Sequence, residues 1–298
     1  MRIALVFMLV LSLPALAGAQ PSGERLSTRA APLADDVVRV VTHWGMDSGS
    51  AQLRVPGVPA AELYDGVGAA TLVAGHDQVL VAYATEGAHS AFLYRIVRRE
   101  GGHASLGEVV RVERPNTRRD VPFSVVATAT ADGFAIFYQE IQADDPSTAD
   151  AYLVRVGADG AALGAAREVA VPWSLAAAID NGHGFHLALI YPGDANGMRL
   201  SMVALDTNGR PEQHPDWSSR PGMIDDVHLV RHGAAIVAFY RGGDGGDRLL
   251  ERDVTRIGSW GQNPPAARDH GRLRQSEAIL IRVHDGAPSA EHVPASAD

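Results

Sequence analysis

A plan of about fifty residues recurs four times along this chain, and it limits the folds that the chain can adopt. Each copy holds a strand of small apolar residues, a glycine turn, a second apolar strand that ends in tyrosine, a polar loop and a third strand. Short apolar runs separated by such turns are typical of antiparallel strands. The repeat therefore predicts an all-β protein made of small equivalent sheets. The closing tyrosines are Tyr83, Tyr138, Tyr191 and Tyr240.

The repeat has the size of one blade of a β-propeller, which consists of four short antiparallel strands. A single small twisted sheet cannot bury both of its faces, whereas sheets stacked around a common axis bury one another. Small side chains suit the innermost strands, which crowd the axis, and the third repeat opens with Ala176, Ala177 and Ala178. We therefore predict a single β-propeller domain over residues 37–285.

The number of blades depends on how the chain ends are used. The four repeats run from about residue 61 to 265, which leaves strand-like segments within residues 37–59 and 275–284. Together these segments would make one more blade from both chain ends, and that blade would lock the ring. We therefore predict five blades of four antiparallel strands, with the last blade closed by both ends. An open arc of four blades and a β-sandwich use the same strands and remain alternatives.

The N-terminus has the features of an export signal. An apolar run follows Arg2, and Ala17-Gly18-Ala19 has the small-x-small pattern that signal peptidase cleaves. Residues 1–19 are therefore predicted to be a signal peptide, and the mature protein to be secreted or periplasmic without a transmembrane span. Residues 20–36 and 286–298 are mostly small or polar, and we expect both to be disordered tails.

The repeat pattern resembles that of bacterial secreted β-propellers in general, and it covers most of the mature chain. The Gly-His and Trp-Asp signature of WD40 repeats is absent from the sequence, and so is the Ser-x-Asp-x-Gly-x-x-Trp box of sialidases. The resemblance therefore implies the fold and export, but it points to no specific family.

Composition excludes several kinds of chemistry. The chain has no cysteine and no lysine, so disulfides, thiol catalysis, Schiff bases and P-loop phosphate clamps are excluded. The formal net charge is −9, which argues against nucleic acid as a partner. The serine-hydrolase elbow G-x-S-x-G and the zinc motif H-E-x-x-H are also absent. We expect a monomer that binds a protein or a glycan.

The stretch from Gly242 to Leu250 fits the calcium nonapeptide pattern G-G-x-G-x-D-x-U-x at every fixed position. A calcium roll needs the motif on successive turns, and this chain has one copy, so a flexible hairpin loop is the favoured interpretation. Carboxylates on equivalent loops of neighbouring blades could still hold a calcium ion. Their alternative role is a solvated acidic rim, and we expect no cofactor otherwise. The candidate ligands are Asp194, Asp244 and Asp247.

A second group of residues lies eighteen positions before the tyrosines, or fourteen positions for Asp226, where the chain is expected to enter the innermost strands at the channel mouth. Asp65, Asp120 and Asp226 could provide acid–base chemistry on a sugar, as in five-bladed glycoside hydrolases, and Trp173 could stack on the sugar ring. Asp at the start of a strand also commonly caps a turn, which requires no catalysis.

The sequence therefore favours a non-enzymatic binding or interaction module for a protein or a glycan. A glycoside hydrolase that uses the carboxylates at the channel mouth is the alternative. A purely structural envelope component is the third class. Nearby carboxyl groups in an open pocket would favour the hydrolase, and carboxyl groups that cap turns would disfavour it.

Overall fold

The computed structural model is an all-β protein, and every element in the part of the chain that it describes is a strand or a turn. Within that part, no helix is long and apolar enough to cross a membrane. The described residues are 25–44, 49–65, 68–85, 91–113, 121–141, 149–171, 174–192, 197–212, 223–243, 246–255, 266–274, 276–284 and 287–294.

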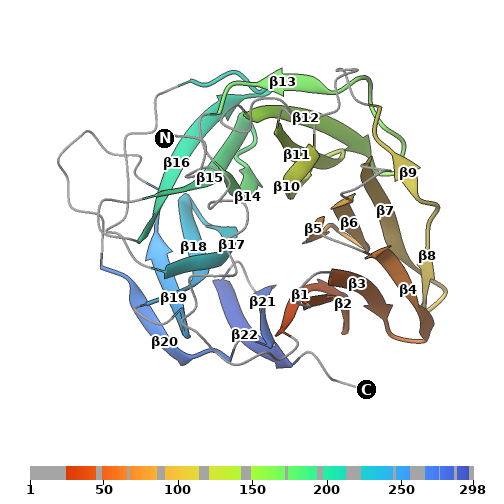
Figure 1. Cartoon of the computed structure of the whole chain (residues 1–298), viewed down its shortest axis with the longest axis horizontal. Helices are drawn as coiled ribbons and strands as arrows, with labels where there is room; N and C mark the ends of the chain where they lie inside the picture. The colour runs from red at the N-terminus through yellow and green to blue at the C-terminus, as the bar shows by residue number, and fades with distance from the viewer. Residues whose placement is uncertain are drawn as a thin grey trace.

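Five antiparallel sheets stand around a common axis as the blades of a β-propeller (Figure 1). Within each blade the strands follow chain order from the axis outward, so the first strand is innermost. A sixth sheet of two strands completes the ring between blade 5 and blade 1. The prediction of a five-bladed propeller is therefore confirmed, although the sixth sheet was not foreseen.

Blade 1 consists of β1 (Arg25–Leu33), β2 (Asp36–Trp44), β3 (Gly49–Val55) and β4 (Val58–Asp65). Blade 2 consists of β5 (Gly68–Ala74), β6 (Gln78–Thr85), β7 (Ala91–Glu100), β8 (His103–Leu106) and β9 (Val110–Arg111).

Blade 3 consists of β10 (Val121–Thr130), β11 (Gly133–Ile141), β12 (Ala149–Gly157) and β13 (Arg167–Val169). Blade 4 consists of β14 (Ser174–Asp180), β15 (Gly184–Pro192) and β16 (Met198–Asp206).

Blade 5 consists of β17 (Met223–His232), β18 (Ala235–Gly243), β19 (Arg248–Asp253) and β20 (Arg268–Arg272). The sixth sheet consists of β21 (Glu277–His284) and β22 (Ala287–Pro294).

Apolar clusters fill every interface between neighbouring sheets of the ring. One cluster joins blades 1 and 2, and others join blades 2 and 3, 3 and 4, and 4 and 5. Two smaller clusters join the sixth sheet to blade 5 on one side and to blade 1 on the other. Each sheet is therefore buried on both faces by its neighbours, as the repeat predicted.

The second strand of each repeat lies deepest in these interfaces, because side chains on both of its faces contact a neighbouring blade. In β11, for example, Phe134, Ile136 and Tyr138 contact blade 2, and Phe137 contacts blade 4. Such a strand reads as a continuous apolar run. Tyr83, Tyr138 and Tyr240 are buried and each lies in the interface with the preceding blade, whereas Tyr191 is half-buried.

The ring closes differently from the prediction, because no single blade is made of both chain ends. β1–β4 form a complete sheet of their own, and β21–β22 form a separate sheet beside it. The two expected tails also contain strands, since β1 lies within residues 20–36 and β22 within residues 286–298. Both strands are short of large apolar residues, which is why the sequence pattern did not reveal them.

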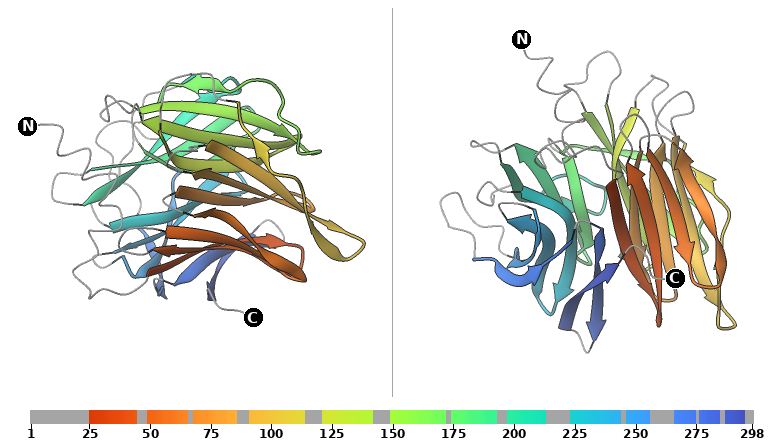
Figure 2. Two further views of the ribbon diagram at one scale, coloured as in Figure 1. Left: turned by 45° about the vertical axis from the view of Figure 1, so that its right-hand side comes forward. Right: turned by 60° about the horizontal axis from the view of Figure 1, so that its bottom comes forward.

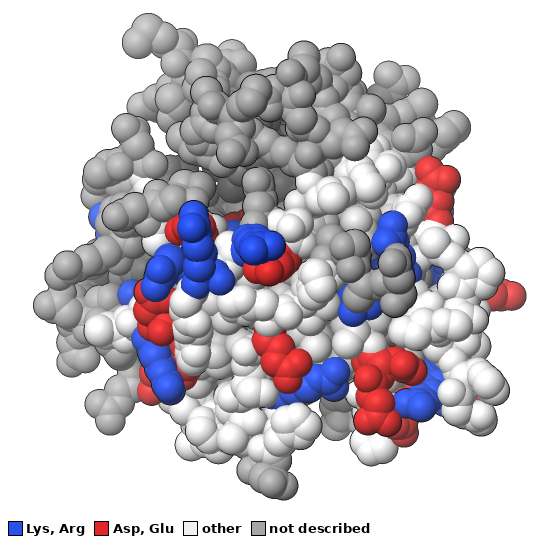
Figure 3. Space-filling model, turned by 90° about the horizontal axis from the view of Figure 1, so that it is seen from below, with Lys and Arg blue, Asp and Glu red and all other residues white. Residues whose placement is uncertain are grey.

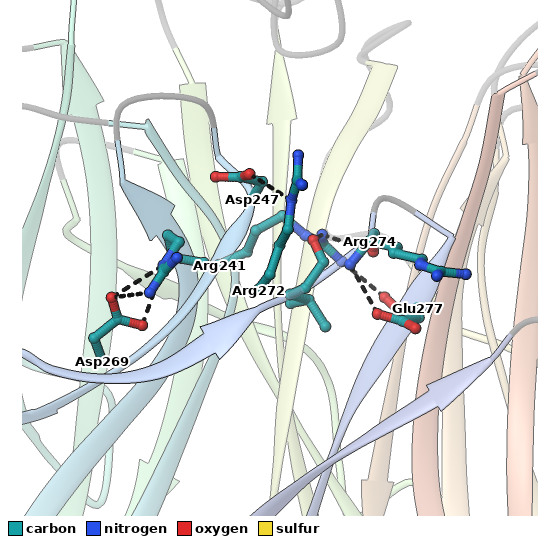
Figure 4. A network of polar contacts seen from close by, with 8 residues as sticks. Arg241, Asp247, Asp269, Arg272, Arg274 and Glu277 are labelled. Carbon is teal, nitrogen blue, oxygen red and sulfur yellow. Dashed lines mark hydrogen bonds and ion pairs between the residues drawn. The ribbon is translucent and has the colours of Figure 1, made fainter.

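A buried arginine attaches the sixth sheet to blade 5 (Figure 4). Arg241, on β18, donates hydrogen bonds to the carbonyl oxygens of Leu273 (3.4 Å), Arg274 (3.0 Å) and Glu277 (2.7 Å). These carbonyls belong to the turn that leads from β20 into β21. The Glu277 carboxylate accepts a further bond from the Arg274 backbone N–H at 2.8 Å, which fixes the same turn.

Other arginines link neighbouring sheets at the face of the ring that lies opposite the Arg241 contacts. Each donates from its guanidinium to a backbone carbonyl in a turn of the adjoining sheet, so it satisfies an acceptor that no strand pairs. These bridges are Arg98 to Asp159 (2.6 Å), Arg155 to Thr207 (2.8 Å) and Arg282 to Ala34 (3.2 Å).

We predict that Arg241→Met lowers the free energy of unfolding by about 3 kcal/mol, because three carbonyls lose a charged donor in a buried place. Urea unfolding measures the loss, and amide hydrogen exchange should show faster exchange in β21 and β22 than elsewhere.

Arg231→Met is the matched control, because exposed Arg231 donates a single bond of 3.2 Å to the Asp180 carbonyl. It should cost less than about 1 kcal/mol. If both variants lost the same free energy of unfolding, the hydrogen bonds of Arg241 would not be what holds the sixth sheet to blade 5.

Candidate functional site

One face of the ring collects the strand ends where the predicted functional residues lie. Because the strands are antiparallel, each first strand begins, each second strand ends and each third strand begins at this face (Figure 2). We call it the loop face; Asp225 at the start of β17 and Arg241 near the end of β18 lie there. The mouth of the ring at this face is the candidate functional site.

The structure describes only part of the predicted set. Asp65 is the last residue of β4, the outermost strand of blade 1, and its side chain is not described. Asp226 lies on β17, the innermost strand of blade 5, and Asp247 immediately precedes β19. The remaining predicted residues, Asp120, Trp173, Asp194 and Asp244, lie outside the described residues.

A β-bulge positions Asp226 at the mouth. The register between β17 and β18 shifts by one residue between Asp225 and His228, and Asp226 has a φ of 49° within this shift. Aspartate tolerates this left-handed conformation better than most residues. The Asp225 carboxylate supports it by accepting the Asp226 backbone N–H at 2.7 Å. Such bulges commonly re-aim a side chain, and here Asp226 becomes buried while Asp225 stays exposed.

Asp226 is ionised and paired. Its Oδ1 lies 3.2 Å from His228 Nε2, and only 9% of the residue is exposed. Burial alone would raise the pKa of Asp226, but the charge and hydrogen bond of His228, followed by the charges of Arg29 and Arg241, together lower it to about 2. A carboxyl group with this pKa holds no proton near neutral pH, so it cannot act as a general acid.

Polar side chains also link the blades at this mouth. Gln139, buried on β11, accepts the backbone N–H of Leu175 at 2.9 Å, and Ser124 donates to the Leu175 carbonyl at 3.1 Å. Both bonds join blade 3 to the innermost strand of blade 4. Polar groups near the mouth therefore link blade 3 to blade 4, as Arg241 links blade 5 to the sixth sheet.

The outer edge of blade 5 carries a ladder of ion pairs. Asp247 Oδ2 accepts a bond from Arg272 Nε at 3.1 Å (Figure 4), Arg248 pairs with Asp269, and Glu251 pairs with His270. The Asp247 carboxylate, predicted as a calcium ligand, therefore forms an ion pair with Arg272 at the exposed edge of the blade. The described residues contain no group of three His, Asp or Glu side chains that could hold a metal ion.

The sequence singled out Asp226 as a candidate, but it did not indicate the residues that lower its pKa. His228, Arg29 and Arg241 come from three strands, and single histidines or arginines carry no motif. The sequence held one weak indication of the pairing with His228. His228 lies two residues after Asp226, and residues two apart in a strand have side chains on the same face.

Comparisons with known proteins support the fold and nothing finer. No family model matches the sequence, and no curated protein matches it. A mutant of AofleA from Arthrobotrys oligospora matches with a TM-score of 0.52 and 10% identity, over 90% of this chain and 78% of that chain. A glucose dehydrogenase matches with a TM-score of 0.50 and 13% identity, over 92% of this chain and 96% of that chain.

A third solved structure, the xylan β-1,4-xylosidase from Bacillus halodurans, matches with a TM-score of 0.50 and 10% identity. The match covers 75% of this chain but only 48% of the xylosidase, so the chain spans about half the length of that protein. Identities this low show a shared propeller fold alone, because one fold hosts many unrelated functions.

We predict that stability falls between about pH 4 and pH 2. The pKa of Asp226 is about 2 in the folded protein against an ordinary value of 3.8, so folding favours the ionised form. This stabilisation is present above pH 4 and is lost as the pH falls towards 2, and it amounts to roughly 2 kcal/mol. Urea unfolding of the wild type and of Asp226→Asn should differ by that amount at pH 6 and converge near pH 2. A difference that persists at pH 2 would contradict the role of ionisation.

We also predict that calcium leaves the melting temperature unchanged, because Arg272 already occupies the Asp247 carboxylate. Differential scanning calorimetry with calcium and then with a chelator provides the measurement. A calcium-dependent rise of several degrees, lost in Asp247→Asn, would support a calcium site at the loop face instead.

Proposed function

We propose that the protein is a non-enzymatic binding module whose loop face takes a glycan or a protein ligand. The observation that carries this proposal is the state of Asp226, which is ionised, buried and paired with His228. Its neighbour Asp225 remains exposed at the mouth, where a carboxylate can accept hydrogen bonds from ligand hydroxyl or amide groups. A xylan β-1,4-xylosidase shares the propeller fold, which supports a glycan as the ligand.

The alternative, a glycoside hydrolase, receives less support from the mouth. Such an enzyme needs one carboxyl group with a raised pKa as the acid and a second carboxylate about 5–10 Å away. The pKa of Asp226 is lowered, which leaves only the nucleophile or base role open to it. The hydrolase would therefore need another carboxyl group as its acid, such as Asp120, which lies outside the described residues.

The remaining expectations belong to the same proposal. The predicted signal peptide in residues 1–19 supports export, so we place the mature protein in the periplasm or the medium, as a monomer. Either location would expose the loop face to glycans and to other exported proteins.

We predict that Asp225→Asn weakens ligand binding at least about tenfold, because it removes a charged hydrogen-bond acceptor from the mouth. A glycan array followed by titration calorimetry on the strongest ligand measures the change. Asp132→Asn is the matched control, since Asp132 is an exposed aspartate in the turn between β10 and β11, at the opposite face. It should leave binding unchanged.

Two results would contradict the proposal. If Asp225→Asn and Asp132→Asn weakened ligand binding equally, the ligand would not bind specifically at the mouth. Turnover of aryl glycosides by the wild type that is lost in Asp226→Asn at pH 6, while the variant remains folded by circular dichroism, would establish the hydrolase.

A further inference from the structure

The sixth sheet is smaller than the blades that it joins. Blades 1 to 5 have three to five strands each, whereas the sixth sheet has two among the described residues. Ala30 and Val37 of blade 1 pack against Ala278 and Leu280 of this sheet.

Two arginines lie on this same face of blade 1. Arg39 is paired with Ala30 across β1 and β2, and it lies two residues after Val37, so it shares their side of the sheet. Arg54 is directly opposite Arg39 on β3. Directly opposed residues of an antiparallel pair have their Cβ atoms only about 5 Å apart, so two like charges meet here.

The two guanidinium groups have no counter-ion among the residues that the structure describes. Arg39 Nε is fully buried and has no hydrogen-bond partner. Glu291, whose residue lies on the face of the sixth sheet that is turned to blade 1, pairs instead with Arg282 at 3.7 Å. Burial lowers the pKa of Arg39, and the charge of Arg54 lowers it further. Opposed cations with an orphaned donor are costly unless an anion satisfies them.

We propose that Arg39 and Arg54 form a binding site for a tetrahedral oxyanion, a sulfate or phosphate group. Planar guanidinium forks suit two oxygens of such a group, and a shared anion would neutralise the pair and supply an acceptor near Arg39 Nε. The side of the ring that includes the sixth sheet shows acidic and basic side chains interspersed (Figure 3), so the site is local and not part of a broad basic surface.

A partner strand added to β22 is a poorer explanation of the opposed arginines. β22 carries Pro288 and Pro294, an even number of residues apart, so both backbone nitrogens point to the same side of the strand. Proline has no N–H to donate and is tolerated in a strand where that side faces solvent. The free edge is therefore blunted against strand pairing, in the way that native edges commonly are.

This site is separate from the proposed loop-face function. Arg39 lies near the start of β2, in the half of the ring opposite the loop face. Loss of anion binding would leave the glycan or protein hypothesis intact, and failure of that hypothesis would leave the anion site intact.

The test compares melting temperatures in sodium chloride, sodium sulfate and sodium phosphate at matched ionic strength. Sulfate stabilises proteins in general, so each variant supplies the baseline. We expect sulfate or phosphate to raise the melting temperature of the wild type by several degrees more than that of Arg39→Gln or Arg54→Gln. Arg111→Gln, which changes an exposed arginine on β9, is the matched control and should respond like the wild type. Titration calorimetry with each anion should give one site per chain and show which anion is preferred.

A second readout separates anion binding from a structural role. In chloride alone, Arg54→Gln should be as stable as the wild type or more stable, because it relieves the repulsion from Arg39. The proposal is overturned if Arg54→Gln is less stable in chloride, or if it keeps the full response of the wild type to both sulfate and phosphate.

Discussion

The stability of this protein depends on apolar contact between neighbouring sheets. Each blade is too small to bury its own faces, so its second strand is covered on both sides by other blades. Six such interfaces follow one another around the ring, and each of them needs the next to be in place. The chain has no cysteine to staple the ring, so its closure depends on side-chain packing and hydrogen bonds.

Charged and polar groups complete that closure, and this affects the candidate site. Arg241 binds three carbonyls of the turn into β21, and its charge also holds Asp226 in the ionised form. The buried polar groups near the mouth in blades 3 and 5 therefore contribute to the architecture. The exposed carboxylate of Asp225 is free of that role towards other blades, which is why we assign it to ligand binding and not to catalysis.

The face of blade 1 that is turned to the sixth sheet contains charged residues. Arg39 and Arg54 lie directly opposite one another on β2 and β3. Arg39 interrupts the apolar run of β2, so blade 1 departs from the pattern of the four repeats.

The sequence by itself determined the all-β class, the propeller and the equivalent second strands that end in tyrosine, because burial on both faces imposes a local apolar run with a regular period. It also placed Asp226 near the mouth, since the start of an innermost strand follows from the repeat. Only the tertiary structure decided how the ring closes, that β1 and β22 are strands, and that Asp226 is neutralised by His228, Arg29 and Arg241. The ring closure and the contacts of Asp226 with Arg29 and Arg241 join residues from different strands, and such contacts leave no periodic trace in the sequence.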